Sequence, residues 1–323
     1  MSASTLLLVA LLFPVLYVLF VRKRSSSSRT FTDLPPGPGW SLPLIGHLYM
    51  LDTDPVESLI KLSEKYGGLF LLDFGPSTAA IITDYKYIDQ AMKMDALPSR
   101  PLKEMESQVL VRGRRTPDGS LPGIAFSDGT IWREQRKFAF QQLIALGFGK
   151  QASIEAVILN ECDTIVRNFS KCHNGPLLTV DCNLFIRAAL NVVWHFVSGN
   201  SMQVPDELLF SAKDFMRSQK PGFISTLQLY SPMLMKLGVK LGQKNMLTAR
   251  TSVDALLDAE ISNHEATFDP NNIRDFIDAY LLKMSQTTDK TSSFYGDLGK
   301  LNMRNSMFDL FIAGMDTTAT TLR

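Results

Sequence analysis

The first 21 residues constrain this chain most, because Met1–Val21 holds no charged side chain and is followed at once by Arg22, Lys23 and Arg24. About 20 apolar residues in a helix span the roughly 30 Å hydrocarbon core of a bilayer. A cleaved signal peptide would instead have basic residues before its apolar run and a small-residue cleavage site after it. Because basic residues stay on the cytosolic side, the sequence predicts that residues 1–24 are a transmembrane signal anchor with the body in the cytosol.

The rest of the chain has the composition of a folded domain that does not bind nucleic acid. Hydrophobic residues make up 45% of the 323 residues. Four of the 33 basic residues precede Asp33, which leaves 29 basic against 32 acidic residues from residue 30 onward. A protein that binds phosphate backbones would show the opposite bias. Three cysteines in a chain of this length exclude a disulfide scaffold, and cytosolic thiols remain reduced.

The N-terminal part of the body predicts a linker followed by a small β element. Residues 25–39 are rich in serine, then proline and glycine, which indicates a flexible spacer and a stiff hinge. Asp54 followed by Pro55 is typical of a helix start, and the glycines at 67 and 68 indicate its end. Residues 69–74 and 78–83 flank Gly75-Pro76 and predict a hairpin. A further helix is expected after Asp84, to about Met94.

The longer C-terminal part is predicted to be helical. Residues 95–130 show no sustained period, which indicates a long loop. Helical patterns continue from Asp128, and the last of them begins near Leu298 and reaches Arg323 without a stop signal. The sequence therefore predicts a mainly α body over residues 40–323 that is part of a longer domain. Expected breaks between helices lie near residues 147–149, 174–176, 199, 221–222 and 269–270.

Several common catalytic patterns are absent from the sequence. It has no Gly-x-Ser-x-Gly, no phosphate-binding Gly-x-x-x-x-Gly-Lys-Ser/Thr, and no His-Glu-x-x-His, since His264-Glu265 lacks a second histidine. The four histidines and three cysteines show no zinc spacing. We interpret them as surface residues or satisfied core residues and predict no metal ligand among them. They are His47, His173, His195, His264, Cys162, Cys172 and Cys182.

Trp132 and Arg136 open a predicted helix and lie one turn apart on one face. An indole N–H and a guanidinium side by side are two donors suited to a carboxylate. A cation–π pair on an ordinary helix is the alternative interpretation. Arg133 and Lys137 form a second pair on the neighbouring face, where charges are normally only solvated.

A polar cluster interrupts the apolar pattern of the last predicted helix at residues 313–318, which read Ala-Gly-Met-Asp-Thr-Thr. Glycine disfavours a helix by about 1 kcal/mol relative to alanine, and short polar side chains compete with the helical backbone. The cluster predicts a point where the helix is locally opened for a ligand. A solvent-facing stripe is the alternative. The pattern of residues 274–282 predicts an amphipathic helix that contributes no catalytic or binding residue.

Together these segments resemble the microsomal cytochromes P450, closest to their family-2-like branch, over the whole chain and in the family's order. The resemblance rests on the apolar anchor and five groups of residues in the body. These are Pro35-Pro36-Gly37-Pro38, Ser99-Arg100-Pro101, Phe126-Ser127-Asp128-Gly129 with Trp132 and Arg136, Arg274-Asp275-Phe276-Ile277-Asp278-Ala279, and Ala313-Gly314-Met315-Asp316-Thr317-Thr318.

The resemblance implies the cytochrome P450 fold, here ending within the long central distal helix, and a haem-thiolate monooxygenase of the endoplasmic reticulum membrane. Such an enzyme inserts one oxygen atom of O2 into an apolar small molecule, with electrons from a separate NADPH-dependent reductase. Arg133 and Lys137 would contribute to the basic surface that docks this reductase. The loop from about Lys103 to Ala125, with Phe308 and Ile312, would line the substrate pocket.

The resemblance also implies roles for the predicted site residues. Trp132, Arg136 and Arg100 would bind the haem propionates. Ala313 and Gly314 would lie against the distal haem face. Asp316 and Thr317 would be the catalytic pair that delivers protons during oxygen activation.

The family's iron-ligating cysteine loop has no counterpart before Arg323, and none of the three cysteines lies in such a glycine-rich loop. Thiolate ligation drives O–O cleavage in these enzymes. The sequence is therefore expected to be a fragment that is inactive alone. The alternative is a non-catalytic, membrane-anchored helical protein from a truncated product.

Overall fold

The computed structural model describes two compact units of the chain, which we treat separately. The first covers described residues between 34 and 94, and the second covers those from 97 onward. No helix among the described residues is both long enough and apolar enough to cross a membrane. The predicted anchor, residues 1–24, lies outside them. The described residues are 34–42, 45–52, 54–74, 77–94, 97, 100, 109, 112–147, 152–171, 183–200, 209–210 and 244–322.

The first unit contains the predicted hairpin. Strands β1 (Leu69–Phe74) and β2 (Ser77–Ile82) pair antiparallel, with Leu69 opposite Ile82 and Phe74 opposite Ser77. The proline-rich segment lies against this hairpin, because the carbonyl of Pro36 accepts a hydrogen bond of 2.8 Å from the Leu71 amide. The hinge is therefore fixed to the sheet from Pro36 onward.

Short helices complete the first unit, with η1 at Leu48–Met50, α2 at Pro55–Tyr66 and α3 at Tyr85–Met92. The Asp54 carboxylate accepts from two amides of the first turn of α2, and Gly67 ends this helix at a φ of 93°. The Asp84 carboxylate caps α3. Leu62 of α2 packs on Phe70 and Leu72 of β1. The sequence prediction is thus confirmed to within one or two residues for α2, the hairpin and α3, whereas η1 was not predicted.

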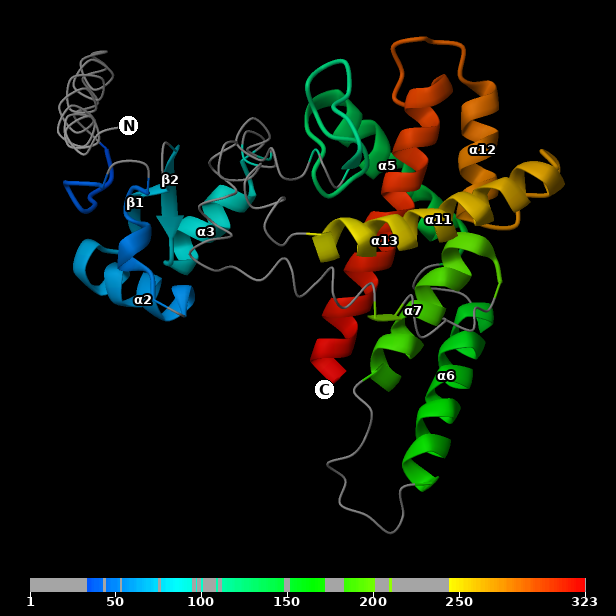
Figure 1. Cartoon of the computed structure of the whole chain (residues 1–323), viewed down its shortest axis with the longest axis horizontal. Helices are drawn as coiled ribbons and strands as arrows, with labels where there is room; N and C mark the ends of the chain where they lie inside the picture. The colour runs from blue at the N-terminus through cyan, green and yellow to red at the C-terminus, as the bar shows by residue number, and fades with distance from the viewer. Residues whose placement is uncertain are drawn as a thin grey trace, which may run out of the picture. The chain divides into compact units, whose positions relative to one another are not determined.

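The second unit is built around one central helix. Its helices are α5 (Gly129–Ala145), α6 (Ala152–Lys171), α7 (Asn183–Ser198), α11 (Lys244–Thr267), α12 (Phe276–Gln286) and α13 (Gly296–Leu322). In Figure 1, α13 runs through this unit, with α11 crossing it and α7 along its C-terminal half. Helices α5 and α12 also pack on α13, and α6 packs on α7.

The core of the second unit joins an aromatic cluster to a buried polar network. Phe138 of α5 contacts the rings of Phe276, Tyr280 and Phe294 at centroid distances of 5.1–5.9 Å. The Tyr280 hydroxyl donates a 2.7 Å hydrogen bond to the Gln135 side chain, whose amide donates to the Ser293 hydroxyl. Because buried polar groups are costly without partners, this network specifies how α5, α12 and the turn before α13 fit together.

Residues 274–282 are not the simple amphipathic helix that the sequence predicts. Arg274 and Asp275 precede α12, and the first five residues of α12 are all buried, because four other helices surround this turn. The Asp278 carboxylate, fully buried, accepts from Arg274 Nε at 2.6 Å and from Nη2 at 2.8 Å. The segment therefore carries a bidentate ion pair that ties the loop to the helix.

His264 joins the same cluster from α11. Its Nδ1 lies 2.9 Å from the Glu260 carbonyl, and its Nε2 lies 2.9 Å from the Asp275 carboxylate. His264, Asp275 and Asp278 offer atoms within 4.8 Å of one another, the spacing of a metal site. Since Arg274 already binds Asp278 and Asp275 binds His264, these groups satisfy one another. His264 and His47 are satisfied core histidines, as predicted, whereas His195 Nδ1 is buried with no hydrogen-bond partner among the described residues.

The ion pairs of His264 lead us to expect that the protein becomes less stable as the pH rises above about 6.5. Burial alone would lower the pKa of His264, but hydrogen bonds to Glu260 and Asp275 and the charges of both residues raise its pKa above the usual value. A histidine with a raised folded-state pKa stabilises fully below the unfolded value of about 6.5 and loses this contribution as pH rises through the folded pKa. We expect the free energy of unfolding to fall above about pH 6.5.

Urea unfolding at a series of pH values measures this dependence, and His264→Gln should flatten it. His195→Gln is the matched control, because His195 has no ion pair among the described residues and should leave the slope intact. An unchanged slope in His264→Gln would assign the dependence to other groups.

Candidate functional site

Trp132 and Arg136 lie on one face of α5, as predicted. The Arg136 guanidinium carbon is 5.6 Å from the Trp132 ring centroid, so the pair forms the cation–π contact of the alternative interpretation. Trp132 is half-buried and Arg136 is exposed. Neither side chain makes a hydrogen bond with another described residue. Their donors are therefore open to an external acceptor while the rings and guanidinium hold each other in place.

Three further basic residues have distinct surroundings. Arg100 Nε donates a 3.2 Å hydrogen bond to the carbonyl of Ala125, which ties Arg100 to the loop before α5. Arg133 and Lys137 are both exposed on the neighbouring face of α5. The structure thus keeps two basic side chains in solvent on one α5 face and a donor pair on another.

The polar cluster of α13 does not open the helix, so that prediction is wrong. Helix α13 is continuous from Gly296 to Leu322. The Thr317 hydroxyl donates a 2.7 Å hydrogen bond to the Ala313 carbonyl, and the Thr321 hydroxyl donates at 2.8 Å to the Thr317 carbonyl. A threonine that bonds back four residues satisfies its own hydroxyl without breaking the helix. Ala313 and Thr317 are exposed and Asp316 is half-buried, in agreement with the solvent-facing stripe.

Gly314 faces another helix. A Cβ atom built on Gly314 would lie 2.3 Å from Cγ2 of Val193 on α7. Since real Cβ atoms do not approach other atoms so closely, any other residue at position 314 would force Val193 or one of the two helices to shift. The glycine in the cluster therefore sets the distance between two helices, a role that its sequence context did not reveal.

The loop before α5 is held by polar side chains of α13. The Asp309 carboxylate accepts from the amides of Ile124 and Ala125 at 2.7 and 2.9 Å and pairs with Arg112. The Asn302 carbonyl oxygen accepts from the Gly123 amide at 3.0 Å. Sequence reasoning missed this anchor. Its signal was the spacing of buried polar residues at 302, 305 and 309, three and seven positions apart on one helical face.

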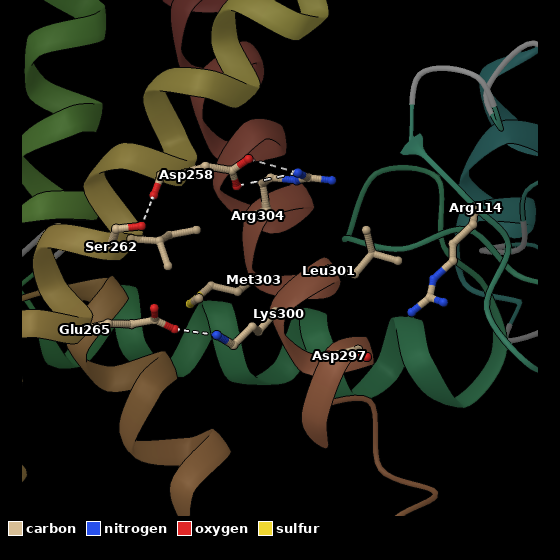
Figure 2. A pocket seen from close by; sticks show the side chains of 10 residues that line it. Arg114, Asp258, Ser262, Glu265, Asp297, Lys300, Leu301, Met303 and Arg304 are labelled. Atoms are coloured by element: carbon tan, nitrogen blue, oxygen red, sulfur yellow. Dashed lines mark hydrogen bonds and ion pairs between the residues drawn. The ribbon is translucent and has the colours of Figure 1, made fainter.

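Phe308 and Ile312 were expected to line a substrate pocket with the loop. Phe308 is instead almost fully buried in the core, and Ile312 packs against that core. The described residues contain a pocket of about 350 Å³ elsewhere, between α11, the N-terminal half of α13 and Arg114. Figure 2 shows that ion pairs cross this pocket, with Lys300 Nζ 2.8 Å from Glu265 and Arg304 3.1 Å from Asp258.

The described residues form a helical protein in which Trp132 and Arg136 of α5 have open hydrogen-bond donors. On α13, the small side chain of Ala313 is exposed. The family model described as "Cytochrome P450" matches residues 35–323. The chain therefore belongs to the cytochrome P450 family, and its similarity to family 2 members makes it family-2-like.

Three curated relatives give the extent of the similarity. The chain is 31% identical to Cytochrome P450 2K1 of Oncorhynchus mykiss over its whole length and 62% of that protein. It is 30% identical to Cytochrome P450 2C20 of Macaca fascicularis, over its whole length and 63% of the relative. It is 30% identical to Cytochrome P450 2J2 of Homo sapiens, over 90% of the chain and 56% of the relative. The chain thus spans about 60% of the length of these relatives.

Proposed function

We propose that this chain is the N-terminal and central part of a haem-dependent monooxygenase that inserts one oxygen atom of O2 into an apolar small molecule. Electrons would come from NADPH through a separate reductase, and the protein would be anchored in the endoplasmic reticulum membrane. The observation that supports the proposal most is the open donor pair of Trp132 and Arg136, because membership of the family predicts an anionic cofactor beside this helix.

The donor set fits a haem through its two propionates. Trp132 contributes one N–H and Arg136 several, and a guanidinium–carboxylate pair is among the strongest hydrogen-bonded contacts in proteins. Arg100 would contribute from the loop, where its bond to the Ala125 carbonyl already directs the side chain. When bound, the haem would supply the oxygen-activating and electron-accepting chemistry.

The residues of α13 would provide the other wall of the site. Ala313 presents a small exposed side chain, which leaves room for a flat group beside the helix. The Thr317 hydroxyl donates a hydrogen bond to the Ala313 carbonyl, so its oxygen can still accept a hydrogen bond from another group. The half-buried Asp316 carboxylate lies next in sequence and would be the second member of the pair that delivers protons. Arg133 and Lys137, exposed on α5, would bind the acidic face of a reductase.

Replacing Arg136 tests the proposal. In a protein that contains this chain and the remaining length of its relatives, Arg136→Ala should lower haem affinity about 10- to 100-fold, because a carboxylate would lose a charge-assisted partner. The haem-to-protein ratio after dialysis measures the effect. Arg133→Ala is the matched control. Arg133 is exposed on the neighbouring face of α5, so this variant should retain haem. Equal haem content in wild type and Arg136→Ala would exclude Arg136 as a haem ligand and leave it only the cation–π contact with Trp132.

A further inference from the structure

We propose that Asn191, His195 and Glu161 form a binding site for a zinc ion between helices α6 and α7. Asn191 and His195 lie on α7, and Glu161 lies on α6. The two helices pack against each other and lie side by side in Figure 1. None of the residues proposed to hold the haem lies on these helices. The ion would therefore have a structural role and would hold α6 and α7 together.

The first observation is a pair of unsatisfied atoms on α7. The side-chain oxygen Oδ1 of Asn191 and the ring nitrogen Nδ1 of His195 are buried and have no hydrogen-bond partner among the residues that the structure describes. Buried polar atoms are nearly always satisfied in native proteins, so each such atom requires an explanation. Residues four positions apart lie on one helical face, with Cβ atoms about 5–6 Å apart. The two unsatisfied atoms therefore belong to neighbouring positions on one face of α7.

The third group is the Glu161 carboxylate. Nδ2 of Asn191 donates a hydrogen bond of 3.1 Å to Oε1 of Glu161. Because an ionised carboxylate can only accept, this bond fixes which end of the Asn191 amide is nitrogen and which is oxygen. The unsatisfied atom of Asn191 is thus an acceptor, which needs a donor or a cation. Glu161 is half-buried and brings a negative charge to the same place.

The chemistry of the three groups favours a zinc ion. An imidazole nitrogen, an amide oxygen and a carboxylate oxygen all carry lone pairs that one cation can engage together. Imidazole and carboxylate are usual ligands of Zn²⁺, at about 2.0–2.2 Å, and water can complete the coordination. Calcium and magnesium prefer oxygen ligands alone, so the imidazole of His195 disfavours them. A bridging water could satisfy the two atoms of α7 but would not neutralise the charge of Glu161.

The other group of residues with the spacing of a metal site is less suited to zinc. His264 Nε2 already lies 2.9 Å from the Asp275 carboxylate, and Arg274 Nε donates to Asp278 at 2.6 Å. An ion there would have to displace a guanidinium. Beside His195 it would displace no protein group, because Oε2 of Glu161 can bind the ion while Oε1 keeps its bond to Asn191.

Zinc binding to the full chain tests the proposal. Isothermal titration calorimetry with ZnCl2 in metal-free buffer measures the dissociation constant. We expect His195→Leu and Glu161→Gln each to weaken binding at least about tenfold, since even residues that only orient a zinc ligand are worth about 10- to 100-fold in affinity. Glu155→Gln is the matched control, because Glu155 is exposed on α6, and its affinity should equal that of the wild type.

Asn191→Asp distinguishes a zinc ligand from a residue that only packs. Aspartate offers a carboxylate oxygen in place of the amide oxygen, but it cannot donate to Glu161 and repels it when no metal is bound. We expect this variant to be less stable than the wild type without zinc and to bind zinc more tightly. Urea unfolding with and without ZnCl2 measures the stability. Without zinc, His195→Leu should be about as stable as the wild type, because an apolar side chain replaces an unsatisfied one.

Absence of zinc binding by the wild type would overturn the proposal and leave water as the partner of the two atoms on α7. Undiminished binding in both His195→Leu and Glu161→Gln would also overturn it, as would weaker binding in Asn191→Asp. Loss of binding in His264→Gln alone would place the ion beside Asp275 instead. Where His195→Leu fails to fold, Glu161→Gln and Asn191→Asp decide the question, because both change half-buried side chains.

Discussion

Asp309→Ala should destabilise the protein by about 3–5 kcal/mol, the cost typical of breaking a buried ion pair from one side. The substitution removes the acceptor of the Ile124 and Ala125 amides and the partner of Arg112. These groups would remain buried, because Asp309 is 7% exposed and Arg112 is 3% exposed. Chemical denaturation followed by circular dichroism measures the free energy of unfolding.

Asp258→Ala is the matched control for this prediction. Asp258 also pairs with an arginine, Arg304 at 3.1 Å, but its side chain is 54% exposed. Exposed ion pairs contribute about 0–1 kcal/mol, so the control should cost far less. If the two variants lost equal stability, the buried anchor of the loop would have no special energetic role.

Gly314→Val should cost about 2–3 kcal/mol through overpacking. A Cβ atom at this position would lie 2.3 Å from Val193 Cγ2, and a β-branched valine in a helix has one strongly preferred rotamer, so Val193 cannot easily move aside. Val193→Ala in the same chain should restore more than half of the loss. The same denaturation measurement completes the double-mutant cycle.

Ala313→Val separates packing from helix propensity. Ala313 is adjacent in sequence but exposed, so valine there should cost only the difference in propensity, below about 1 kcal/mol. Additive losses in Gly314→Val and Val193→Ala would show that the two helices adjust around the new side chain.

Local chemistry explains how much of this fold could be predicted. Helix starts at Asp54, Asp84 and Asp128 were marked by capping residues that act within one turn. The hairpin was predicted because Gly75-Pro76 separates two apolar runs. Such signals need no knowledge of the rest of the chain.

The site was predicted less completely because its decisive partners are distant in sequence. The shared face of Trp132 and Arg136 is local, and it was found. Val193, which makes Gly314 necessary, lies on a different helix, and no periodic pattern indicates it. The threonines of α13 suggested an opened helix because their bonds to the carbonyls four residues earlier were not foreseen. The donors to the Asp309 carboxylate could not be identified from the sequence, because they lie in a loop more than 180 positions away.

The anchor at Asp309 has a consequence for the order in which the chain folds. Its carboxylate bonds to an amide 185 positions earlier. A ribosome that adds about 5–20 residues per second makes those positions in roughly 10–40 seconds. During that interval the segment around Ile124 and the cation of Arg112 have been synthesised, but their acceptor has not. We therefore expect this loop to be among the last parts to become protected from proteolysis during synthesis, after the hairpin has closed on its neighbours in sequence.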